Sequence, residues 1–161
     1  MVNVVVQLSK YLITIIMLLF TLQSFTALKE RDEYERRYIL GKQILMILLL
    51  DFICFFVMYL QKGELETVKM YLLLMVYILM VQILYRLIYK KASMILVNNM
   101  CMLLSISIIM LTRLSIAKAS SQFNIMALST LICFIIPVVV RKAKFLKSLT
   151  WFYAVIGIAM L

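Results

Sequence analysis

The chain of 161 residues contains no histidine, three glycines and one proline. Without an imidazole group, a Ser-His or Cys-His catalytic couple and a histidine-ligated metal are excluded. The glycines at positions 41, 63 and 157 are too far apart for a phosphate-binding loop or a small-residue helix-packing motif, which excludes Walker-type nucleotide chemistry. We therefore expect no catalytic residue, no cofactor-binding residue and no metal ligand in this chain.

Cysteine is also scarce. Cys54, Cys101 and Cys133 each lie in an apolar stretch, and their spacing fits neither a C-x-x-C motif nor a zinc site. We expect buried, unpaired thiols that pack as small hydrophobic side chains. The 13 methionines are scattered along the chain, which is typical of core filling and not of a copper-binding string.

Hydrophobic residues make up 66% of the chain, against about 45–50% in ordinary soluble domains. They form six stretches, most of about 18–20 residues, which is the length that crosses a bilayer core of about 30 Å. We therefore predict an all-α, polytopic transmembrane helix bundle and exclude a soluble globular domain. The stretches are 11–28, 43–60, 70–89, 94–112, 123–140 and 148–161.

The sixth stretch differs from the other five in length. At 1.5 Å per residue it extends only about 21 Å, which is less than the hydrocarbon thickness. The prediction is thus five full spans plus a truncated sixth. A complete small membrane protein would finish the span and add a polar tail, so we expect this chain to be the N-terminal part of a longer protein.

The net charge of +10 is dispersed between the apolar stretches and forms no recognition motif, so nucleic acid is excluded as a partner and the bilayer is expected instead. Twelve of the 17 Lys and Arg residues lie in 29–42, 86–93 and 141–147. The positive-inside rule places these segments in the cytoplasm and the N-terminus outside. The basic group at 141–147 is read as a topology determinant, with a contact to anionic lipid headgroups as the alternative.

The segment 29–42 interleaves acids and bases at helical spacing, for example Glu33 with Arg37. Two interpretations are open, a short solvated helix or a charged connector, and the connector is favoured.

Asp51 is the single acid inside an apolar stretch, where an ionised carboxylate costs at least about 2.5–3.5 kcal/mol. By depth, its expected partner is Gln82 on the next span. A proton or ion relay and an interhelical hydrogen bond are both open interpretations, and the second is favoured because no other acid is buried nearby. Ser105, Ser107, Ser129 and Thr130 are expected to bond between helices or to their own backbones, and Pro137 predicts a modest kink.

The last third of the chain carries four loose motifs. They are a Met-x-x-Arg-Leu helix end, an Ala-x-x-Gln helix entry, a basic stretch and an aromatic-rich opening of a further helix: Met110, Arg113 and Leu114; Ala119 and Gln122; 141–147; Thr150, Trp151 and Tyr153. With these motifs, residues 107–161 resemble the start of the SEDS proteins (shape, elongation, division and sporulation), the family of FtsW, RodA and SpoVE.

The resemblance implies a division into residues 1–93, three additional N-terminal transmembrane helices with a cytoplasmic charged loop, and residues 94–161, the incomplete start of a SEDS-like membrane domain. It implies a peptidoglycan glycosyltransferase of the bacterial plasma membrane, acting in cell division or cell-shape maintenance. In full length such an enzyme polymerises a lipid-linked precursor, and a penicillin-binding protein is the implied partner. The family's catalytic aspartate belongs to later loops and has no matching position here, so we expect this chain alone to be inactive.

Two other functions remain open. One is a small noncatalytic integral membrane protein that scaffolds or regulates a partner. The other is a transporter fragment, which the lack of broken helices and internal repeats disfavours.

Overall fold

The computed structural model describes residues 2–89 and 93–142, with side chains over 4–89 and 93–136. Within these ranges the chain forms no strand and five helices, each long and apolar enough to cross a membrane. The predicted all-α, multi-pass architecture is thus confirmed for five spans, while the predicted stretch 148–161 lies outside the described residues. The helices are α1 (Val2–Lys29), α2 (Glu33–Lys62), α3 (Leu65–Ile88), α4 (Met94–Leu114) and α5 (Ile116–Lys142).

By its contacts the chain divides into two units, residues 1–122 and 123–161. The first unit contains α1 to α4 and the first turns of α5. The described part of the second unit is the remainder of α5, which continues as a helix through Pro137 to Lys142.

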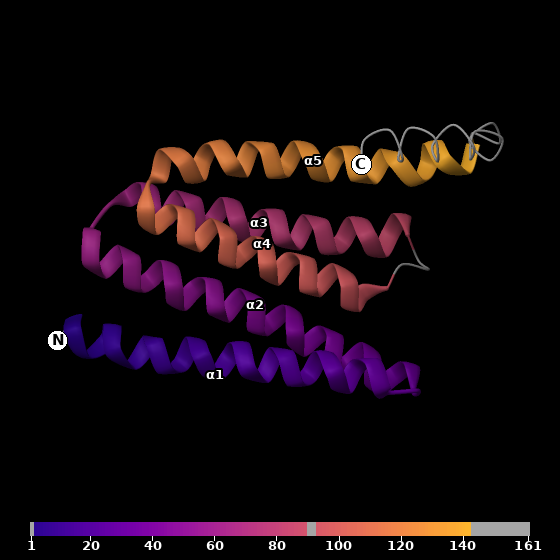
Figure 1. The fold of residues 1–161 in the computed structure, drawn as a ribbon, viewed down its shortest axis with the longest axis horizontal. Helices are drawn as coiled ribbons and strands as arrows, with labels where there is room; N and C mark the ends of the chain where they lie inside the picture. Colours follow the sequence, from indigo (N-terminus) through magenta and orange to yellow (C-terminus); the bar gives the residue numbers. More distant parts are fainter. Residues whose placement is uncertain (1, 90–92, 143–161) are drawn as a thin grey trace, which may run out of the picture. The chain divides into compact units, whose positions relative to one another are not determined.

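Helices α1 to α4 run alternately in opposite directions (Figure 1). At one end, which we call the basic end, α1 and α3 finish and α2 and α4 begin. At the opposite end, α1 and α3 begin and α2 and α4 finish. Of the segments that the positive-inside rule assigned to the cytoplasm, 29–42 and the described residues of 86–93 lie at the basic end. Most of the third segment, 141–147, lies outside the described residues.

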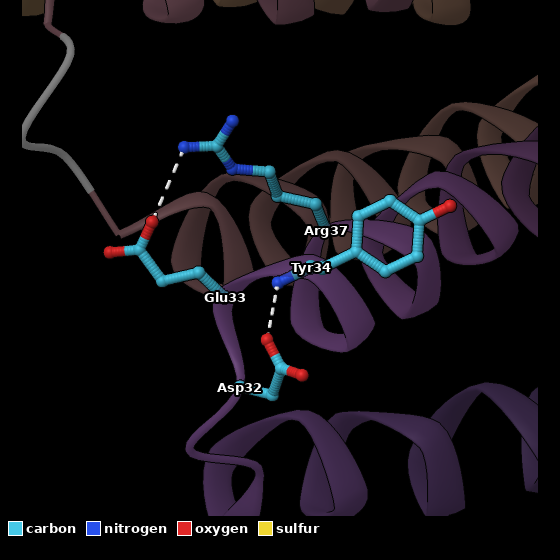
Figure 2. A network of polar contacts seen from close by, with 4 residues as sticks. All are labelled: Asp32, Glu33, Tyr34 and Arg37. Carbon is cyan, nitrogen blue, oxygen red and sulfur yellow. Dashed lines mark hydrogen bonds and ion pairs between the residues drawn. The ribbon is translucent and has the colours of Figure 1, made fainter.

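The residue directly before α2, Asp32, caps the start of this helix (Figure 2). The Asp32 carboxylate accepts a hydrogen bond from the backbone N–H of Tyr34 at 3.0 Å, and Glu33 and Glu35 occupy the positive end of the helix dipole. The predicted pair between Arg37 and Glu33 is confirmed at 3.5 Å, although both side chains are more than 80% exposed, so the pair contributes only about 0.3–0.5 kcal/mol.

The favoured interpretation of this segment as a connector was wrong for most of its length. Residues 33–42 form the first turns of α2, and the non-helical link is only 30–32. The cap and the acidic first turn are sufficient to start the helix before its apolar part begins. Gly63 ends α2 in the left-handed conformation, with φ 66°, and its N–H donates to the Tyr59 carbonyl at 2.8 Å.

The core of the first unit lies along α2 and α4, because each of them contacts the other and both α1 and α3. Ile47, Leu74, Ile78 and Ile108 are fully buried in this core. Large apolar side chains cover the outer faces of all four helices, as lipid-facing surfaces require. The core also encloses polar side chains, which form the site described next.

Candidate functional site

Three amide side chains from three helices meet inside the bundle. Gln43 on α2, Gln82 on α3 and Asn98 on α4 are all less than 5% exposed. The Asn98 Nδ2 donates to Gln43 Oε1 at 2.9 Å and to the Leu40 carbonyl at 3.1 Å, and the Asn98 Oδ1 accepts from Gln82 Nε2 at 2.7 Å. Asn98 therefore joins α2, α3 and α4 through one side chain.

The same network reaches α1. Gln43 Nε2 donates to Ser24 Oγ at 2.9 Å, and the Ser24 hydroxyl lies 3.1 Å from the Phe20 carbonyl and 3.2 Å from Asn99 Oδ1. Since a hydroxyl has one hydrogen, Ser24 donates to one of these two acceptors at a time. We call Ser24, Gln43, Gln82, Asn98 and Asn99 the amide network.

The amide network lies near the basic end of the bundle. Asn98 is only about 6 Å along α4 from Met94, and Gln43 directly follows the basic residue Lys42. In a medium that offers no water, each of these amides would be costly without a partner. The network thus holds α1 to α4 in one rotational setting, because a rotation of α4 would break several bonds together.

Asp51 lies deeper in the bundle and is fully buried on α2. Its Oδ2 accepts a hydrogen bond from Ser105 Oγ on α4 at 3.2 Å, and its Oδ1 has no partner among the described residues. The predicted pairing of Asp51 with Gln82 was wrong. Depth was a sound criterion, but the rotation of α2 turns Asp51 toward α4, while Gln82 is engaged by Asn98.

The surroundings of Asp51 support an interhelical hydrogen bond more than a relay. No ion pair reaches Asp51 in the described ranges, where the one salt bridge is that of Arg37 with Glu33. One hydroxyl offers little compensation to an ionised carboxylate at mid-membrane, where the charge costs at least about 2.5–3.5 kcal/mol. No second acid is buried among the described residues, so a chain of proton carriers is not formed there.

The next side chains are a hydroxyl and the cysteines named in the sequence analysis, and their roles are structural. Thr130 bonds back to the Met126 carbonyl at 2.9 Å, as predicted for a hydroxyl in a span. All three cysteines are unpaired, but the predicted burial holds for Cys101, partly for Cys54, and is wrong for Cys133, which is exposed. Within the described ranges, no three His, Cys, Asp or Glu side chains gather as metal ligands would.

Sequence reasoning missed the amide network, including its hub Asn98. The available signal was compositional: Asn98 and Asn99 interrupt an otherwise apolar stretch, "MILVNNMCML", and Gln43 opens another. Amides inside a span are expected to find partners on neighbouring helices.

No protein-family model, curated protein or solved structure matches the chain. The fold and the amide network define an α-helical, multi-pass membrane protein.

Proposed function

We propose that this chain is the N-terminal membrane part of a SEDS-type peptidoglycan glycosyltransferase that acts in cell division or cell-shape maintenance. The observation that supports this most is the position of one helix boundary. Met110, Arg113 and Leu114 close α4, and Ala119 and Gln122 lie in the first two turns of α5. The first motif therefore lies at the end of one helix and the second at the start of the next, as the resemblance requires.

In this proposal α1 to α3 are additional helices that dock on the family-like part. The amide network supports such a docking role, because Asn98 on α4 bonds to Gln43 on α2 and to Gln82 on α3. Under this proposal the amide network joins the additional helices α2 and α3 to α4, which is taken as the first helix of the family-like part.

The proposed membrane orientation has the basic end in the cytoplasm of a bacterial cell and the N-terminus outside. One cysteine added at a time, at the exposed position of Tyr34 or Ser120, tests it in a background with the exposed Cys133 replaced by serine. An impermeant thiol reagent added to intact cells should label Ser120→Cys and leave Tyr34→Cys protected. The reverse labelling pattern would show the opposite topology, and the topology would then no longer support the family assignment.

Catalysis in this proposal depends on parts of the enzyme outside residues 1–161. Polymerisation of a lipid-linked sugar needs a carboxylate or comparable base beside the acceptor hydroxyl. Asp51 is buried and bonded to Ser105, and Glu64 and Glu66 lie exposed at the α2–α3 connection. The lipid-linked precursor and a penicillin-binding protein are accordingly proposed as partners of the full-length enzyme only.

Complementation tests the proposed function. The complete open reading frame that contains these residues, expressed in strains depleted of a division or an elongation polymerase, should restore growth in one of them, while residues 1–161 should not. A well-inserted full-length protein that restores neither strain would refute the proposal. Polymer formed from purified lipid substrate by residues 1–161 would refute the placement of catalysis elsewhere.

A noncatalytic scaffold or regulator is the second candidate. It is favoured by the chemistry of the amide network, which joins helices and presents no reacting group. The reading frame separates the two candidates: further spans and a large extracellular loop with an acid favour the polymerase, and a stop codon directly after Leu161 favours the scaffold.

A further inference from the structure

A cleft of about 390 Å³ opens between α1, α2 and α4 in the half of the bundle that lies away from the basic end. Its volume falls within the range of about 300–1,000 Å³ that is usual for small-molecule sites. The walls come from three helices, with Ile13 and Met17 on α1, Cys54 and Val57 on α2, and Ile106 and Ile109 on α4 among them.

The charged and amide residues that line the cleft lie at its outer rim. Lys10 on α1, Gln61 on α2 and Arg113 on α4 all line it, and all three are exposed. At 1.5 Å per residue, Lys10 lies about 28 Å from Lys29, and Arg113 lies about 28 Å from Met94. This distance matches a hydrocarbon core of about 30 Å, so the rim lies at the membrane surface opposite the basic end.

The apolar part of the cleft extends inward from this rim. Met17 and Ile106 lie about 10 Å deeper than Lys10 and Arg113 along their helices, and Leu50 lies about 16 Å deeper than Gln61. The cleft is thus amphipathic along the membrane normal, with two cations above an apolar slot.

The charges of the two cations at the rim determine which ligand the cleft complements. Neither Lys10 nor Arg113 takes part in an ion pair in the described ranges. The Arg113 carbonyl accepts a hydrogen bond from Lys62 Nζ at 3.4 Å, which adds a third positive charge at the same end of α2 and α4. A ligand that complements this arrangement has an anionic head at the membrane surface and an apolar tail.

We propose that this cleft binds an anionic phospholipid, with one acyl chain between α1, α2 and α4 and the phosphate at Lys10 and Arg113. The site is formed by residues 6–113 and does not depend on the proposed enzymatic function. Uncharged and zwitterionic lipids would fill the slot but bind more weakly, because they lack the net negative charge that the two cations attract. By filling the space between the three helices, the lipid would stabilise the packing of α1 on α2 and α4 at the end farthest from the amide network.

Native mass spectrometry of the purified 161-residue chain tests this proposal. The protein, delipidated in a neutral detergent, is incubated with phosphatidylglycerol and phosphatidylcholine that have identical acyl chains. A second incubation pairs phosphatidylglycerol with a polyprenyl phosphate. The wild type should retain phosphatidylglycerol preferentially. The double variant Lys10→Gln, Arg113→Gln should lose about 30-fold in affinity for it, which corresponds to about 1 kcal/mol for each cation.

Matched controls separate the cleft from the general surface charge. Lys69→Gln with Lys118→Gln removes two exposed cations that do not line the cleft, and should leave the preference unchanged. Ile109→Trp fills the slot and should reduce retention of both lipids. Leu103→Trp, at a residue of α4 that is 69% exposed and does not line the cleft, should not. Thermal unfolding of every variant identifies any that are misfolded.

Four results would overturn the proposal. The first is equal retention of the two phospholipids by the wild type. The second is a loss of phosphatidylglycerol affinity in the Lys69→Gln, Lys118→Gln variant that equals the loss in the Lys10→Gln, Arg113→Gln variant. The third is unchanged retention of both lipids by Ile109→Trp. The fourth is preferential retention of a polyprenyl phosphate over phosphatidylglycerol, which would assign the cleft to a carrier lipid.

Discussion

Replacement of Asn98 by leucine should loosen the bundle more than any other single amide substitution. Asn98→Leu removes three hydrogen bonds and leaves the Gln43 Oε1, the Leu40 carbonyl and one Gln82 donor position without their partner. Interhelical hydrogen bonds in membranes average about 0.6 kcal/mol and reach about 1.7 kcal/mol. The expected loss in unfolding free energy is therefore about 2 kcal/mol, with about 5 kcal/mol as the upper bound.

The neighbouring residue provides a matched control. Asn99 is only half-buried, and its one bond to Ser24 competes with the Phe20 carbonyl for the same hydroxyl hydrogen. Asn99→Leu should therefore cost no more than about 0.6 kcal/mol. Unfolding by SDS in mixed micelles, followed by circular dichroism, measures both variants on the same helix with the same chemical change.

A double-mutant cycle tests whether the bonds act as assigned. Gln82→Leu combined with Asn98→Leu should destabilise less than the sum of the two single changes, because the double variant no longer leaves the Gln82 amide with only its weak contact to Cys101 Sγ at 3.9 Å. An Asn98→Leu loss equal to that of Asn99→Leu, or a coupling energy of zero with Gln82, would refute the role of Asn98 as the hub of the amide network.

Three further outcomes are expected. Asp51→Asn should leave insertion and abundance nearly unchanged because an amide oxygen still accepts from Ser105, and loss of activity in the full-length protein at normal abundance would instead indicate a relay. Ser105→Ala should cost about 0.6–1.7 kcal/mol in SDS unfolding because it removes the donor to the Asp51 carboxylate, and a neutral result would show that this bond is not formed. Gly63→Ala should cost about 1 kcal/mol because its φ of 66° is left-handed, and an unchanged SDS midpoint would contradict this assignment of the α2 end.

The hydropathy of the sequence was sufficient to predict five spans and the alternation of their connections. A stretch that crosses a bilayer must be apolar over about 20 residues whatever its neighbours are, so the property is local. Prediction of the boundaries was less accurate. α1 begins at Val2 and α2 at Glu33, because capping and helix propensity extend a helix beyond its apolar part.

The sequence by itself also showed that Asp51 needs a partner, since the cost of burying a carboxylate depends on the solvent and not on the fold. Only the tertiary structure decided that the partner is Ser105 and that Gln82 belongs to Asn98. Partner choice depends on how each helix is rotated and which helices are neighbours, and rotations of a few tens of degrees change it without changing hydropathy. The same rotations bring Lys10 and Arg113, which are far apart in the sequence, to the rim of one cleft.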